Sequence, residues 1–190
     1  ANTVQPSTGS ILQLSVGELA DLRLNGDLSD GNDEVIITGD NSGLNIQVNG
    51  ISTSVDVPGT ILVRLGEGND KFDASGIAAG TNVKFEIYGG SGNDDIILGG
   101  NASGSYVEGG VGDDLIVGTS GSDILIGQDG DDIILGEDGR DIISGDQLEI
   151  GSSNTLQARP TLSDGSDWIS GGTNDDIIFG SGGADTLLGD

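Results

Sequence analysis

From residue 89 onward the chain alternates between three mostly apolar residues and six residues rich in glycine, aspartate and serine. Glycine and aspartate favour turns, and a short apolar run bounded by turn residues favours a buried strand. Each nine-residue unit therefore predicts a turn followed by a three-residue strand, and two units form one 18-residue coil. The units start at Gly89, Gly109, Gly118, Gly127, Gly136, Gly171 and Gly180.

Two positions of the unit are the most regular. The eighth position is the middle of the strand, so its side chains are predicted to fill a thin core between stacked coils. The sixth position ends the turn, so its aspartates are predicted to line up along the stack. The eighth positions are Ile96, Ile116, Leu125, Ile134, Ile143, Ile169, Ile178 and Leu187. The sixth positions are Asp94, Asp114, Asp123, Asp132, Asp141, Asp167, Asp176 and Asp185.

The nine-residue period is interrupted twice. Residues 98–108 hold one degenerate unit plus two extra residues, with Ser105 at the aspartate position and Val107 at the apolar position. The second interruption is a 17-residue insertion at 147–163, which contains Pro160. An insertion of this length and composition is predicted to be a surface loop.

The first 88 residues follow a different pattern. Apolar and polar residues alternate with a period of two at 44–48, 60–65 and 83–88, which predicts half-buried strands. The Gly-Asn-Asp triplet of the later units also occurs at 31–33 and 68–70.

We therefore expect an all-β fold with two portions. Residues 89–190 are predicted to form a β-solenoid of stacked two-strand coils, and residues 1–88 a β-rich N-terminal portion whose degenerate coils continue the same solenoid.

The net charge changes this picture, because it is −26, with 6 Lys and Arg against 32 Asp and Glu. Binding to nucleic acid or to an anionic membrane needs a basic surface, so both are disfavoured. A highly charged chain with 3% aromatic residues also suggests disorder. The predicted solenoid and the composition typical of disorder are compatible if order depends on a metal. We therefore expect the chain to be disordered without a metal and folded with it.

The composition also restricts which metal ion the turns can bind. Adjacent coils lie ~4.8 Å apart, and two carboxylates at that separation repel by roughly 3 kcal/mol at an effective dielectric constant near 20. A hard divalent cation between the turns reverses the sign of this interaction. Calcium accepts six to eight oxygen ligands, whereas magnesium retains its waters, and zinc and copper prefer the His and Cys that this chain lacks.

The units at 89–97 and 109–117 closely resemble the repeats-in-toxin (RTX), or haemolysin-type, calcium-binding nonapeptide. The resemblance covers roughly residues 89–190. It implies a right-handed parallel β-roll that binds several calcium ions between the turns of units i and i+2, with the eight sixth-position aspartates as metal ligands. The implied pairs are Asp94 with Asp114, Asp114 with Asp132, Asp123 with Asp141, Asp132 with Asp167, Asp141 with Asp176, and Asp167 with Asp185.

Several residues depart from the family pattern. Ser105 is expected to leave its site weak or empty, and the insertion is expected to disturb the pairing of Asp132 with Asp167. Asn174 replaces the fourth-position glycine but tolerates left-handed geometry. Asp33 and Asp70 are candidate ligands in the N-terminal portion. Other turn carboxylates, namely Asp95, Asp113, Asp131 and Asp175, are interpreted as solvated charges.

The seventh and ninth positions of the units are unusually apolar and are expected to point away from the core. They either pack against residues 1–88 or the insertion, or they contact another chain, and the sequence leaves both interpretations open. These residues are Ile124, Ile126, Ile133, Leu135, Ile142, Trp168, Ile177 and Phe179.

No catalytic function is predicted, because catalytic triads that use His or Cys are excluded and calcium explains the paired carboxylates. One hypothesis is an extracellular structural protein of bacteria, such as a surface layer, adhesin or self-assembling filament. The alternative is an accessory module for secretion and folding, cut from a larger secreted enzyme or toxin. No apolar run is long enough for a membrane helix, and the absence of an initiator Met at Ala1 is interpreted as trimming or processing.

Overall fold

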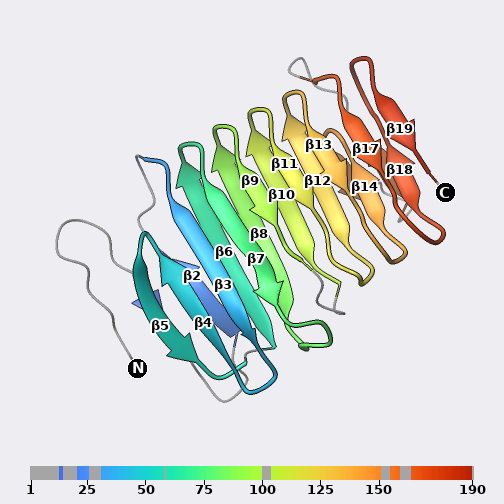
Figure 1. Cartoon of the computed structure of the whole chain (residues 1–190). Helices are drawn as coiled ribbons and strands as arrows, with labels where there is room; N and C mark the ends of the chain where they lie inside the picture. The colour runs from blue at the N-terminus through green and yellow to red at the C-terminus, as the bar shows by residue number, and fades with distance from the viewer. Residues whose placement is uncertain are drawn as a thin grey trace.

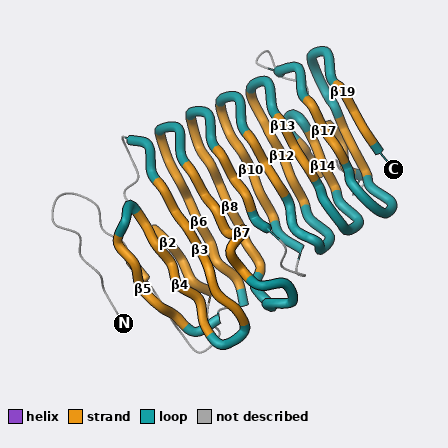
Figure 2. Tube along the Cα trace, viewed as in Figure 1, coloured by secondary structure: helices purple, strands orange, loops and turns teal. Residues whose placement is uncertain are grey.

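The computed structural model describes residues 13–14, 21–25, 31–57, 59–99, 104–150, 155–158 and 164–189. In this part of the chain, short strands alternate with turns and no helix is present, as Figure 2 shows. The chain winds repeatedly through two facing sheets, and the coils follow one another along a single axis (Figure 1). Among the described residues, no helix is long and apolar enough to cross a membrane.

Strands that follow one another in the repeat region alternate between the two sheets. The first sheet has the order β1 (Gln13–Leu14), β2 (Asp21–Asn25), β6 (Thr60–Glu67), β8 (Lys84–Ser91), β10 (Tyr106–Val111), β12 (Ile124–Asp129), β14 (Ile142–Ser144) and β18 (Ile177–Phe179). The second has the order β19 (Thr186–Leu188), β17 (Trp168–Ser170), β13 (Ile133–Leu135), β11 (Leu115–Val117), β9 (Asp95–Ile97), β7 (Lys71–Ile77), β3 (Glu34–Asp40), β4 (Gly43–Val48) and β5 (Ile51–Val55).

The predicted parallel β-solenoid is confirmed by the pairing of these strands. From β6 to β19, each strand of the two sheets pairs in parallel with the strand one coil away, and equivalent positions of the units face each other. Ile116, for example, lies between Ile96 and Ile134. The strands β6, β7 and β8 carry both sheets into the N-terminal portion, so the solenoid begins before residue 89.

Besides the short pairing of β1 with β2, antiparallel pairing occurs at two further places in the described part of the chain, and the repeat pattern predicts neither. The strands β3, β4 and β5 form an antiparallel meander at the N-terminal end of the second sheet. Its second turn contains Asn49 and Gly50 with φ of 48° and 81°, which suits a tight hairpin turn. Within the insertion, β15 (Leu148–Ile150) pairs antiparallel with β16 (Leu156–Ala158), so this predicted loop contains a short hairpin.

Strand lengths also differ between the two sheets. Strands β9, β11 and β13 have the predicted three residues, whereas β8, β10 and β12 extend into the first residues of the next turn. In β10 this extension includes Gly110, which is aligned with Gly90 of the preceding coil. The backbones approach closely there, because a Cβ on Gly110 would overlap the carbonyl oxygen of Gly90.

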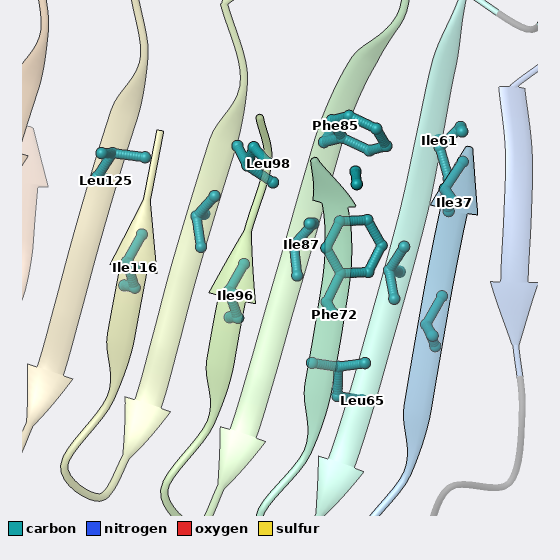
Figure 3. Close-up of a cluster of buried hydrophobic side chains, with 14 of the residues drawn as sticks. Ile37, Ile61, Leu65, Phe72, Phe85, Ile87, Ile96, Leu98, Ile116 and Leu125 are labelled. Carbon is teal, nitrogen blue, oxygen red and sulfur yellow. The ribbon is translucent and has the colours of Figure 1, made fainter. Parts of the chain in front are cut away.

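The core is a continuous row of apolar side chains that both sheets contribute and that lies between them, and Figure 3 shows part of it. The eighth-position residues from Ile96 to Ile169 are completely buried, as predicted. Toward the N-terminus the row widens around Phe72 and Phe85, whose rings meet edge to face with centroids 5.4 Å apart. At the other end the last coil has only one neighbour, so Leu187 is 47% exposed although it occupies a core position.

Truncation of one core residue should therefore be costly even with calcium bound. Ile134 is completely buried, and the adjacent Ile133 in the same strand is 46% exposed. We expect Ile134→Ala to lower the free energy of unfolding by about 2–5 kcal/mol. Ile133→Ala is the matched control, with a cost below ~1 kcal/mol. Urea unfolding in saturating calcium measures both, and equal losses would contradict the assignment of the core face.

Candidate metal sites

The sixth-position aspartates of alternate turns form a column along one edge of the stack. The backbone N–H of each aspartate donates a hydrogen bond to Oδ1 of the aspartate in the next coil, at 2.7–3.1 Å. The pairing of Asp132 with Asp167 is intact at 2.9 Å, so the expectation that the insertion disturbs it is wrong. This first column consists of Asp33, Asp70, Asp94, Asp114, Asp132, Asp167 and Asp185.

The remaining turns form a second column on the opposite edge. Asp123 N–H donates to Oδ1 of Asp141 at 2.8 Å, and Asp141 N–H donates to Oδ1 of Asp176 at 2.9 Å. Ser105 begins this column, because its N–H donates to Oδ1 of Asp123 although its own side chain is not a carboxylate. The structure thus brings together all six pairs of aspartates implied by the family resemblance, and their role as metal ligands stays a prediction.

The second carboxylate oxygen of most column residues is buried without a hydrogen-bond partner in the protein. A buried polar atom without a partner costs free energy, and a buried charge costs more. A column of such atoms is therefore explained by a ligand that the oxygens coordinate. The atoms are Oδ2 of Asp70, Asp94, Asp114, Asp132, Asp141, Asp167 and Asp176.

The first glycine of each turn keeps the space beside these oxygens open. A Cβ on Gly109 would lie within 3.0 Å of both Asp114 Oδ2 and the carbonyl oxygen of Gly127 in the next coil. The same two kinds of oxygen surround the missing Cβ of Gly89, Gly118, Gly127, Gly136 and Gly145. Carboxylate and carbonyl oxygens are the ligands that calcium prefers, so the arrangement fits this ion at each interval between coils.

Backbone oxygens are needed to complete these sites. Among the described residues, no group of three or more Asp or Glu side chains converges closely enough to hold a metal ion. Each interval instead presents carboxylates from two coils together with glycine carbonyls. Such mixed oxygen coordination suits calcium better than magnesium, which demands a stricter geometry and keeps its waters.

Burial raises the pKa of the column carboxylates well above the ordinary value. The pKa of Asp132 is raised to about 8, and those of Asp94, Asp114 and Asp141 to about 7. The pKa values of Asp123 and Asp167 are raised to about 6. Loss of hydration is the largest cause for every one of them, and neighbouring carboxylates add to it for most. In the absence of a metal, burial therefore favours the protonated form of these carboxyl groups, most strongly for Asp132.

Two column positions depart from this arrangement. Oδ2 of Asp123 accepts hydrogen bonds from the backbone N–H and the hydroxyl of Thr119, at 2.6 and 3.0 Å, so this oxygen is already partnered. Next to Asp70, the place of the first glycine is taken by Leu65, whose side chain is buried in the core. Asp70 Oδ2 is buried and unpartnered as in the later turns, but its turn lacks the first glycine that lies beside the carboxylate there, so we expect calcium from Asp94 onward and not at Asp70.

The turn carboxylates interpreted as solvated charges are indeed exposed, but two of them have a structural role. Asp113 N–H donates to the side-chain oxygen of Asn93, and Asp131 N–H donates to Oδ1 of Asp113, at 3.1 and 3.0 Å. Fifth-position Asn and Asp side chains thus form an outer ladder between coils. Their spacing of 20 and 18 residues, about one coil, was visible in the sequence, but the hydrogen-bond direction was not.

Asp146 was missed as a candidate by the sequence analysis. It is the second residue of its turn, immediately before the insertion, and its side chain is 1% exposed. Burial, opposed by hydrogen bonds from backbone N–H groups, raises the pKa of Asp146 to about 6. The sequence did contain a signal for Asp146. It is a carboxylate at the second position of its turn, where other turns have glycine, such as Gly90 and Gly110.

A side chain at the first glycine of one turn should block calcium binding at one site. Gly127→Ala places a Cβ against Asp132 Oδ2 and the Gly145 carbonyl oxygen. We expect it to raise the calcium concentration at half-saturation about tenfold and to remove one ion from the stoichiometry. Gly59→Ala is the control, because a Cβ there meets no atom within 4 Å. Isothermal titration calorimetry measures both variants, and unchanged binding by Gly127→Ala would exclude this position for the ion.

Comparison with protein families gives a match to a repeat family. The sequence profile described as the RTX calcium-binding nonapeptide repeat matches in four copies, at residues 86–102, 108–146 and 162–190. These segments contain all eight sixth-position aspartates that were identified as candidate ligands. A search of curated proteins found no match.

Proposed function

Over residues 86–102, 108–146 and 162–190 the chain belongs to the RTX calcium-binding nonapeptide repeat family, and from this premise we propose that it is a calcium-ordered structural protein outside the bacterial cell. In this proposal, calcium drives the folding of the β-roll, and the folded rods associate through their apolar outer faces. The observation that carries the calcium-dependent step is the column of buried aspartate oxygens without partners beside glycine carbonyls.

Calcium binding and folding are coupled because neither column exists in the unfolded chain. Each interval contains ligands from two coils, so an ion that binds there joins segments 18 or more residues apart in the sequence. The binding free energy then contributes directly to folding. A protein with this coupling stays unfolded at low calcium and folds where calcium reaches ~10⁻⁴–10⁻³ M, as for extracellular modules. This supports an extracellular location.

The structural role is supported by the outer faces of the two sheets. Trp168 and Ile133 are neighbours on the second sheet and Ile177 lies on the first, and all three are exposed. Apolar side chains gathered on a flat sheet face are typical of contact surfaces. Not every outward-facing position is exposed to solvent, because Ile126 is only 6% exposed. The sheet faces rather than the turns are therefore the proposed contact regions.

No catalytic activity is proposed. The sequence contains neither His nor Cys. The strongly buried aspartates lie in the two columns or next to the insertion, where neutralisation by a cation explains them without an enzymatic role.

One experiment tests both steps of the proposal. Far-UV circular dichroism and multi-angle light scattering are recorded on the same samples during calcium and magnesium titrations. We expect strand signal in calcium alone, followed by a concentration-dependent rise in mass. A calcium-folded product that stays monomeric at all protein concentrations would overturn the assembly role and favour the accessory module. Strand signal that does not depend on the calcium concentration would overturn the whole proposal.

A matched variant separates assembly from folding. Ile133→Ser with Trp168→Ser removes two neighbouring apolar side chains from the outer face of the second sheet and leaves the core row unchanged. We expect the calcium midpoint measured by circular dichroism to stay within about twofold of the original, while the assembled mass falls. Unchanged assembly would exclude this face as the contact surface.

A further inference from the structure

The insertion at 147–163 is flanked on each side by an acidic residue. Asp146 immediately precedes it and Asp164 immediately follows it, within the turn that joins β14 to β17 (Figure 1). Asp146 and Asp164 both lie against Gly182 of the next coil. Oδ2 of Asp146 accepts a hydrogen bond from the Gly182 N–H at 2.8 Å, and a Cβ on Gly182 would overlap the carboxyl group of Asp164. We call Asp146, Asp164, Ser181 and Gly182 the insertion neck.

Two buried oxygens at the neck have no hydrogen-bond partner in the protein. One is Oδ1 of Asp146, whose side chain is 99% buried, since only 1% is exposed. The other is Oγ of Ser181, the residue that precedes Gly182. Gly182, which donates to Oδ2 of Asp146, also lies against the carboxyl group of Asp164, so the two carboxyl groups approach the same residue. A buried carboxylate oxygen without a partner costs free energy, and a cation that coordinates it offsets this cost.

The neck also places additional carboxylates beside the last interval of the first column. An ordinary interval, such as that between Asp114 and Asp132, is bordered by two column aspartates, each of which also borders a neighbouring interval. The interval between Asp167 and Asp185 is bordered in the same way, and the neck adds Asp146 and Asp164 to it. This part of the stack therefore has two carboxylates that the ordinary intervals lack, and carboxylate oxygens are ligands of hard divalent cations.

We propose that the insertion neck binds an additional hard divalent cation of calcium size, distinct from the ions of the aspartate columns. Asp146 Oδ1, the Asp164 carboxylate and the Ser181 hydroxyl supply side-chain oxygens, and backbone carbonyls complete the coordination, as calcium allows. The ion holds together the two ends of a 17-residue excursion whose carboxylates would otherwise repel each other. It thereby anchors the insertion to the stack.

This site differs from the repeat sites in the position of its ligands. Asp146 is the second residue and Asp164 the third residue of the interrupted turn, whereas the column aspartates are sixth residues. The residues at the second position of the coils at 89–97 and 109–117 are Gly90 and Gly110. Replacement of Asp146 by glycine therefore restores a residue that the fold already uses there, and the variant is expected to keep its columns.

The test compares calcium stoichiometry in the full chain and in Asp146→Gly with Asp164→Asn. Titration calorimetry with calcium should show one ion fewer per chain in the double variant, with the calcium midpoint of folding within about twofold of the original. The control, Asp95→Asn with Asp175→Asn, removes the same charge from two exposed residues and should lose no ion. Hydrogen exchange of the amides at 147–163 provides a second measurement.

The outcomes are distinguishable from those of the proposed function. In calcium, we expect the amides at 147–163 to exchange faster in the double variant than in the parent chain or in the control. Exchange in the repeat strands should stay unchanged. An unchanged ion count, with water occupying the neck instead, would overturn the additional site and leave the column sites intact. Loss of several ions or of calcium-dependent folding would show that the neck belongs to the columns, which also overturns it. A parent chain that binds no calcium would overturn both proposals.

Discussion

In a metal-free buffer at pH 8 the repeat region should lose most of its strand signal, and acidification to about pH 5 should restore much of it. The column carboxylates have folded-state pKa values raised to about 6 to 8, against roughly 3.9 in an unfolded chain. The folded state therefore binds more protons than the unfolded state between these values, and stability falls as the pH rises.

The size of this effect follows from the number of groups. A shift of one pKa unit corresponds to about 1.4 kcal/mol, so a carboxylate raised by two to three units costs roughly 3–4 kcal/mol when ionised. A few such groups equal the ~5–15 kcal/mol that stabilises an ordinary domain. The penalty is smallest below the unfolded pKa and is fully developed above pH 8, where the most strongly shifted group, Asp132, is ionised.

Calcium should reverse the direction of the pH dependence. The ion binds the ionised carboxylates, so its affinity and the stability of the bound form rise with pH through the same range. Circular dichroism of metal-stripped protein from pH 4 to pH 9, with and without saturating calcium, measures both trends. Metal-free strand signal that does not change with pH would contradict the buried, unpaired state of the columns.

Asp132→Asn should have opposite effects in the presence and absence of calcium. Asp132 lies in the middle of the first column, where it pairs with Asp114 and Asp167. With calcium, the variant loses a charged ligand in two intervals, so we expect at least a tenfold higher calcium midpoint, about 1.4 kcal/mol or more, and up to two ions fewer. Without calcium, it removes a buried charge, so at pH 8 the variant should keep more strand signal than the parent chain.

Asp70→Asn is the matched control for this prediction. Asp70 belongs to the same column and is also buried, but Leu65 occupies the place of the first glycine in its turn. Replacement of Asp70 should leave the calcium stoichiometry unchanged and shift the midpoint by no more than about twofold. Equal losses of calcium in the two variants would show that the metal sites extend into the N-terminal portion.

The central pairing of the columns was predictable because the repeat is nearly exact. Asp114 and Asp132 are 18 residues apart, which is one coil, and the stacking of equivalent positions follows from that period. Asp132 and Asp167 are 35 residues apart, and the structure keeps their hydrogen bond. The insertion lies wholly inside one turn, so it changes the length of the connection without changing the register of the strands on either side.

The N-terminal portion was less predictable because its coils differ in length. Asp33 donates to Asp70 across 37 residues, and Asp70 donates to Asp94 across 24, so no fixed period aligns them. The extra residues between Asp33 and Asp70 include β4 and β5, which extend the second sheet antiparallel. Local alternation predicted strands there, but the direction of pairing depends on contacts between segments distant in the sequence.

By itself, the sequence determined the solenoid, its core residues and the two columns of aspartates, because a nine-residue period places equivalent side chains on the same line. Only the tertiary structure decided which carboxylates are buried with an unpaired oxygen. It showed that Thr119 partners Asp123, that Leu65 is buried in the core where later turns have their first glycine, and that Asp146 and Asp164 both lie against Gly182. Burial and hydrogen bonding depend on the adjacent coil, and the order of residues along one strand does not contain that information.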